Sequence, residues 1–244
     1  MDTSREPILN APPVVGWTIA ALVAIHVARN LLTQDADMQL LLMFAFIPAR
    51  YDATQFAFPG GMAGDIWTFV TYAGLHGDFM HLAVNSIWLL AFGSAVAWRF
   101  GATRFLLFMA ATAALGAAFY LLFHTGEITP MIGASAAISG LTAAAIRFVF
   151  EAGGPLGAFR RRGRAAFAIP AVPLWDIVRS PQIMVFVAIW FGINLVYAVT
   201  AAVGGMPSLV AWEAHIGGFL AGLILFPVFD PKLPLGVSDF RRGA

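Results

Sequence analysis

The segment MIGASAAISG, residues 131–140, places two serines among small residues in a chain that is otherwise strongly apolar. Small residues allow membrane helices to pack closely, so the segment could be only a contact surface between helices. Alternatively, its first serine, Ser135, could be a nucleophile held inside a membrane. The composition of the chain and the positions of its other polar residues bear on this choice.

The composition is that of an integral membrane protein. Of the 244 residues, 60% are hydrophobic and 11% are charged, whereas soluble domains are roughly 25% charged. The net charge of +1 gives no reason to expect a nucleic-acid partner, and the absence of cysteine excludes disulfides and thiol chemistry. We therefore expect one all-α domain embedded in the lipid bilayer.

Six segments have about the apolar length that a membrane-spanning helix needs. They are residues 13–33, 79–98, 103–123, 134–150, 182–203 and 212–229. These segments predict a six-helix core over residues 13–230, with short tails at 1–12 and 231–244. Residues 34–75 are expected to form an outer loop, in which the short apolar run Met38–Ile47 is interfacial or re-entrant.

The distribution of positive charge predicts the orientation of this core. With a cytoplasmic N-terminus, 12 of the 14 Lys and Arg residues fall on the inner side and only Arg29 and Arg50 on the outer side. Both termini are therefore expected in the cytoplasm. This topology suggests a bacterial inner (plasma) membrane, and the lack of a visible internal repeat argues against a solute transporter.

Four polar side chains are predicted to share one depth in the membrane. Counted from the inner ends of their segments, Ser135, His215, His81 and Asn85 lie roughly 21–27 Å above the cytoplasmic boundary. The hydrocarbon core is about 30 Å thick, so this layer is close to the outer surface. Polar residues inside spans are costly and point to function. Their coincidence at one level is the main sequence evidence for a catalytic site.

These residue types suit nucleophilic catalysis. Gly133 and the preceding Pro130 favour a loop, so Ser135 is expected at a helix start, where free backbone N–H groups can stabilise an anion. His215 could act as the base. His81 and Asn85 are four residues apart and share a helix face, so both could point at one developing oxyanion.

Each polar residue also has a simpler structural interpretation. His215 alone could be an interhelical histidine, and Asn194 is expected to make a packing hydrogen bond. Asp78 is expected to be solvated, and Glu213 is two residues from His215 and should point elsewhere on the helix. Ser139 lies one turn below Ser135 and is expected to line the site rather than act as nucleophile. Without an HExxH motif, no zinc or other metal site is expected.

The three motifs together resemble the rhomboid family of intramembrane serine proteases. The matching elements are a G-x-S (Gly133–Ser135), an A-H-x-x-G-x-x-x-G (Ala214–Gly222), and a histidine followed five residues later by H-x-x-x-N (His76, then His81 and Asn85). They occur in the family's order on the second, fourth and sixth expected helices. The likeness covers about residues 13–230.

The resemblance implies a serine endopeptidase with a Ser135–His215 dyad and no cofactor. The Ser135 backbone N–H, His81 and Asn85 would form the oxyanion hole, while His76, Gly133 and Ser139 would line the site. Substrates would be transmembrane segments of other proteins, entering past the fifth helix as a lateral gate. The sequence does not indicate an oligomeric state. The alternative is a catalytically silent rhomboid-like protein that binds membrane helices for trafficking or degradation, although such relatives typically lack the serine or the histidine.

Three positions differ from the common family pattern. Ala136 follows the serine where many members have glycine, and Ser139 stands where a tyrosine that stacks on the histidine is common. In the first loop, Trp67 is followed by Thr68 rather than by arginine. The first two differences concern the geometry of the dyad, and the third concerns the anchoring of the loop.

Overall fold

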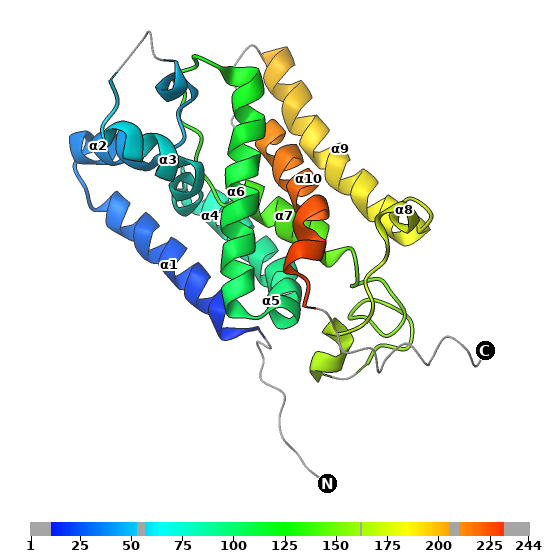
Figure 1. Ribbon diagram of the computed structural model, residues 1–244. Helices are drawn as coiled ribbons and strands as arrows, with labels where there is room; N and C mark the ends of the chain where they lie inside the picture. Colours follow the sequence, from blue (N-terminus) through cyan, green and yellow to red (C-terminus); the bar gives the residue numbers. More distant parts are fainter. Residues whose placement is uncertain (1–10, 53–56, 162, 205–209, 232–244) are drawn as a thin grey trace.

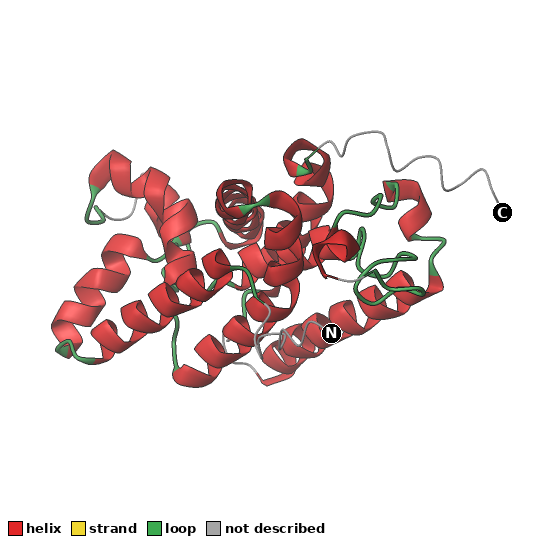
Figure 2. Cartoon of the chain, turned by 90° about the horizontal axis from the view of Figure 1, so that it is seen from below, coloured by secondary structure: helices red, strands yellow, loops and turns green. Residues whose placement is uncertain are grey.

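The described part of the chain consists mostly of helices joined by loops (Figures 1 and 2). The computed structural model describes residues 11–52, 57–161, 163–204 and 210–231, so the expected tails lie almost wholly outside the described residues. The α-helices are α1 (Pro13–Asn30), α2 (Gln34–Phe44), α3 (Gly61–Thr71), α4 (Phe79–Trp88), α5 (Ser94–Phe100), α6 (Ala102–His124), α7 (Ser135–Ala145), α8 (Leu174–Ile177), α9 (Pro181–Gly204) and α10 (Trp212–Phe229). No β-strand occurs within these ranges, which confirms the predicted all-α class.

Four helices are long and apolar enough to cross a membrane. Within the residues that the structure describes, these are α1, α6, α10 and the continuous helix Phe79–Phe100. The last of these joins α4 to α5 through a π-helical stretch at Leu89–Gly93. Two further helices have shorter apolar stretches: α7 over Ser135–Ala145, and α9 over its part Pro181–Val196. Every one of the six expected segments therefore contains a helix, and the chain is an integral, multi-pass membrane protein.

Helix α7 is shorter than the predicted 134–150 and ends at Ala145. Its length is about 16 Å, far less than the thickness of the hydrocarbon core. After Ala145 the chain tightens into turns, in which the amide of Phe148 donates to Ala145 O at 3.0 Å. The Arg147 side chain is buried and donates to Val172 O at 2.6 Å, so it is engaged with a later loop. The prediction was therefore wrong about the end of this helix.

Close packing of α6, α7 and α10 forms the centre of the molecule (Figure 1). Glycines allow it: a Cβ on Gly218 would overlap the backbone carbonyl of Ala136, and one on Gly222 would overlap that of Gly140. Where the three helices meet, a Cβ on Gly116 of α6 would lie 2.8 Å from Ala136 Cβ on α7 and 2.9 Å from Ala214 O on α10. Residues Ala136–Ala145 are all buried as a result.

The outer loop is a folded unit in which α2 and α3 run across the direction of α6 (Figure 1). Its anchor is the buried Arg50, which donates to Leu42 O, to Pro59 O at 3.0 Å and to an Asp65 carboxylate oxygen at 3.4 Å. Trp67 Nε1 donates to Met43 O at 2.9 Å. Thr68 is fully buried. Arg50 thus ties α2 to α3, although the position directly after Trp67 holds a threonine and not an arginine.

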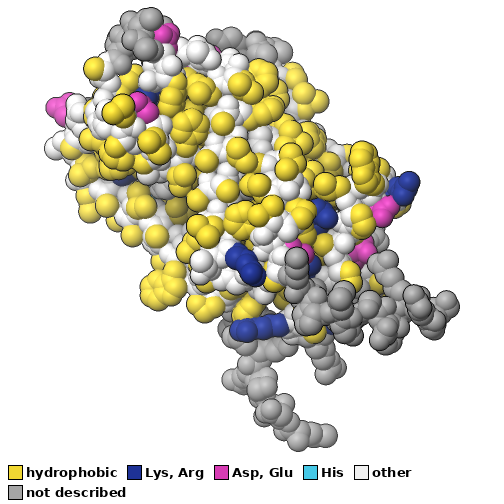
Figure 3. All heavy atoms as spheres, viewed as in Figure 1, with side chains coloured by type: hydrophobic (Ala, Val, Ile, Leu, Met, Phe, Trp, Pro, Cys, Tyr) yellow, Lys and Arg dark blue, Asp and Glu magenta, His cyan; other side chains and the backbone are white. Residues whose placement is uncertain are grey.

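Large apolar side chains cover much of the surface (Figure 3). Exposed examples lie on the helices that are long enough to span a membrane: Trp17, Ile87, Leu122, Ile224 and Val228. A soluble protein rarely exposes so much continuous apolar surface, whereas a lipid bilayer stabilises it. Several polar residues of the predicted spans, such as Asn85, Ser139 and Asn194, are instead buried in the interior.

Candidate active site

The backbone before α7 fixes the position of Ser135. Met131 forms a β-bridge with Phe46, and the amide of Gly133 donates to Tyr72 O at 3.0 Å. Gly133 has φ +119°, a conformation that residues with a side chain rarely adopt. The chain then enters α7 at Ser135, as the sequence predicted. The first amides of the helix have no intrahelical acceptor and are free to bind an anion.

Ser135 and His215 are in direct contact. His215 Nε2 lies 2.7 Å from Ser135 Oγ, within the range that proton transfer between a nucleophile and its base requires. His215 is in the first turn of α10, and the close approach of Gly218 to Ala136 sets the two helices at this separation. Both residues are half-buried. The arrangement is chemically suited to acyl transfer.

His81 lies beside the same backbone segment. A Cβ on Gly133 would stand 2.7 Å from His81 Nε2 and 3.8 Å from Ser135 Oγ, so the imidazole and the hydroxyl flank one glycine. Any side chain at position 133 would displace the His81 ring. Asn85 is buried one turn further along α4, and its Nδ2 donates to His81 O at 2.9 Å. The role of His81 and Asn85 as oxyanion donors stays a prediction.

The other residues singled out from the sequence lie around this centre. The buried His76 ring lies edge-on to His81, with ring centroids 5.1 Å apart, and its carbonyl accepts from Arg29 Nη1 at 2.8 Å. Ser139 Oγ donates to Ser135 O at 2.7 Å, so its hydroxyl is occupied within α7. His76 and Ser139 therefore contact residues of the site but not the Ser135 hydroxyl.

Two acidic residues have structural roles away from the dyad. Asp78 caps α4 by accepting from the amide of His81 at 2.7 Å, and this hydrogen bond holds the pKa of the Asp78 carboxyl below its usual range. Glu213 lies 3.1 Å from His124 Nε2 on α6 and does not contact His215. The expectation that Glu213 is no member of a triad agrees with this geometry.

Asn194 is the residue whose partner the sequence did not identify. It was expected to make a packing hydrogen bond, but its Oδ1 lies 2.7 Å from His215 Nδ1. The sequence does indicate the depth of Asn194, because this polar residue lies 13 positions beyond the start of α9 at Pro181. That is about 20 Å along the helix, close to the layer of the other polar residues.

Comparison with known proteins agrees with the geometry. The family model of the rhomboid domain matches residues 63–231, which is more than half of the chain. The chain therefore belongs to the rhomboid family, whose members are generally intramembrane serine proteases. No curated protein matches the chain significantly.

Substituting Ala136 by glycine is expected to change activity by less than about 3-fold. The Ala136 methyl faces Gly116 on α6, and the Ser135–His215 contact forms with alanine in place. The substitution adds backbone freedom in a helix, at a cost of about 1 kcal/mol in stability. Thermal unfolding and initial cleavage rates of the two proteins in the same lipid measure both effects. A 100-fold change in rate would contradict this assignment of Ala136 to packing.

Proposed function

We propose that this chain is an active intramembrane serine endopeptidase that cleaves transmembrane segments near the outer face of the membrane. The observation that carries the proposal is the 2.7 Å contact between His215 Nε2 and Ser135 Oγ at the start of α7. A silent membrane-helix binder has no need for this contact between a hydroxyl and a base.

The proposed mechanism assigns a role to each of these side chains. Ser135 Oγ attacks the substrate carbonyl carbon while His215 Nε2 accepts the hydroxyl proton. The oxyanion that forms is stabilised by the Ser135 amide, His81 and Asn85. The intermediate collapses to an acyl-enzyme as His215 returns the proton to the departing amine. Water then attacks the acyl group with His215 again acting as base, and Ser135 is regenerated.

The topology we propose has six spans, with both termini in the cytoplasm. The support is the concentration of Lys and Arg on one side of the predicted spans. The core comprises residues 13–230, residues 34–75 lie at the outer side, and 1–12 and 231–244 are cytoplasmic tails. A bacterial inner membrane suits this arrangement. Ser135 then lies in the outer leaflet, where water can reach it from outside.

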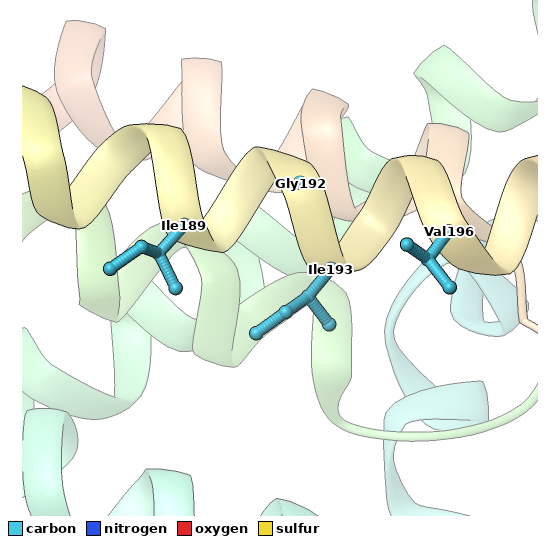
Figure 4. Close-up of a pocket in the computed structure, with 4 residues that line it drawn as sticks. All are labelled: Ile189, Gly192, Ile193 and Val196. Atoms are coloured by element: carbon cyan, nitrogen blue, oxygen red, sulfur yellow. The ribbon is translucent and has the colours of Figure 1, made fainter.

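Substrate segments enter beside α9. A shallow, open apolar surface lies along one face of this helix and is lined by Ile189, Gly192, Ile193 and Val196 (Figure 4). Its lining matches the side chains of a transmembrane helix. The substrate helix must unwind before its carbonyl can reach Ser135, so residues with low helix propensity near its outer end favour cleavage.

The test uses the purified full-length protein in liposomes with a single-span substrate that carries glycine and serine near its outer end. We expect mass spectrometry to locate a cut inside the span near that end, and no cut with the Ser135→Ala variant. A substrate with leucine at the same positions is the matched control and should be cleaved more slowly. Binding of the substrate without cleavage by the unsubstituted protein would overturn the proposal in favour of a silent binder.

A further inference from the structure

The imidazole of His215 is held from both sides. While Nε2 contacts Ser135, Nδ1 lies 2.7 Å from Asn194 Oδ1. Asn194 is only 6% exposed, whereas its neighbours Ile193 and Leu195 are exposed on the outer surface of α9. Asn194 thus points inward from a third helix, while Ser135 and His215 come from α7 and α10.

The hydrogen bonds of Asn194 determine which end of its amide faces the imidazole. Its Nδ2 donates to Trp190 O, one turn earlier in α9, at 2.8 Å. The amide oxygen must then face His215, because the reverse orientation would place two oxygens against each other. An amide oxygen can only accept a hydrogen bond, so His215 Nδ1 must carry the proton.

This arrangement selects one form of the neutral histidine. With the proton on Nδ1, the lone pair of Nε2 is directed at the Ser135 hydroxyl, which is the form a general base needs. The opposite tautomer would present an N–H to Ser135 and could not accept its proton. The residue one turn after Ser135 is Ser139, which has no ring to stack on the imidazole.

We infer that Asn194 is a positioning residue that holds His215 in the Nδ1-protonated form and fixes the direction of its Nε2 toward Ser135. The inference rests on the proposed function in that His215 is taken as the base. It extends the dyad to a hydrogen-bonded series of Ser135, His215 and Asn194. Because Asn194 belongs to α9, the position of that helix determines whether the imidazole is correctly oriented.

The first readout is the protonation of the two ring nitrogens of His215. Nitrogen NMR of the full-length protein, labelled with ¹⁵N-histidine in lipid nanodiscs, separates protonated from unprotonated nitrogens, and the His215→Gln variant assigns the signal. We expect Nδ1 protonated and Nε2 unprotonated in the unsubstituted protein. The Asn194→Leu variant, which keeps the branching at Cγ but has no acceptor, should show a mixture of tautomers. A protonated Nε2 in the unsubstituted protein would overturn the inference without any substitution.

The second readout is the rate of substrate cleavage. Asn194→Leu is expected to lower kcat about 100-fold with little change in KM, the size of loss that a small misplacement of a catalytic group produces. Asn194→Asp retains an acceptor oxygen and should restore part of the rate and the tautomer. Leu195→Ala, an adjacent change on the exposed face of α9, should affect neither. Unchanged kcat and tautomer in Asn194→Leu would contradict the inference.

The two readouts distinguish failure of this inference from failure of the proposed function. If the unsubstituted protein cleaves no substrate but Asn194→Leu still alters the tautomer of His215, Asn194 positions the imidazole and only the protease activity is refuted. If the protein cleaves its substrate and Asn194→Leu changes neither readout, the protease activity stands and the role of Asn194 is refuted.

Discussion

Substituting Ser135 by alanine, His215 by alanine, or both together is expected to lower kcat for cleavage by a similar factor of at least about 10⁴. In the proposed mechanism the two side chains act as one unit through their 2.7 Å contact, so removing either leaves the other without a function. The losses should therefore not multiply in the double variant. Cleavage of a single-span substrate in liposomes, followed to long times, measures all three rates.

Ser139→Ala is the matched control for this series. Ser139 Oγ donates to Ser135 O and is occupied within α7, so its removal should cost far less activity than removal of Ser135. Thermal unfolding in the same lipid establishes that each variant is folded. Loss of activity on Ser139→Ala with retention on Ser135→Ala would exchange the assigned roles of the two serines. Additive losses from Ser135 and His215 would indicate that they do not form a dyad.

Substituting Gly218 by valine is expected to separate the dyad. A Cβ at this position would overlap the backbone carbonyl of Ala136, and backbone of this kind cannot turn aside as a flexible side chain can. Helix α10 must move away from α7, and His215 moves with it. Overpacking typically costs about 1–3 kcal/mol, and displacement of a catalytic group by about 1 Å can lower the rate about 100-fold.

Gly16→Val in α1 is the control for Gly218→Val. Apart from the backbone of its own helix and its chain neighbours, no atom lies within 4 Å of a Cβ at Gly16. The same chemical change should therefore leave cleavage near its original rate. Unfolding temperature and cleavage rate should both fall for Gly218→Val and only slightly change for Gly16→Val. Equal behaviour of the two variants would contradict the claim that close packing of α7 and α10 positions the site.

The sequence predicted the apolar core helices and the common level of Ser135 and His215, because both depend on where apolar segments begin and end. All six expected segments contain helices, and the level calculated for Ser135 and His215 agrees with their direct contact. The start of α7 at Ser135 was also predictable, since Gly133 before it favours a loop. These features follow from the local sequence and from the thickness of a membrane.

Features that depend on how helices face one another were not predictable. The end of α7 at Ala145 depends on Arg147 reaching Val172, which lies 25 residues further along the chain. The anchoring of the outer loop by Arg50 depends on one acceptor in α2, Leu42 O, and another in the turn before α3, Pro59 O. Asn194 could be placed near the right depth, but only the rotation of α9 about its axis decides that it faces His215.

The most direct test of the account is to identify the residue that a fluorophosphonate probe modifies in the full-length protein. We expect a single covalent adduct on Ser135, located by peptide mass spectrometry, and its loss in the His215→Ala variant because the hydroxyl is then no longer activated. An adduct on another serine, or an adduct on Ser135 that forms equally fast without His215, would contradict the claim that these two residues form the catalytic dyad.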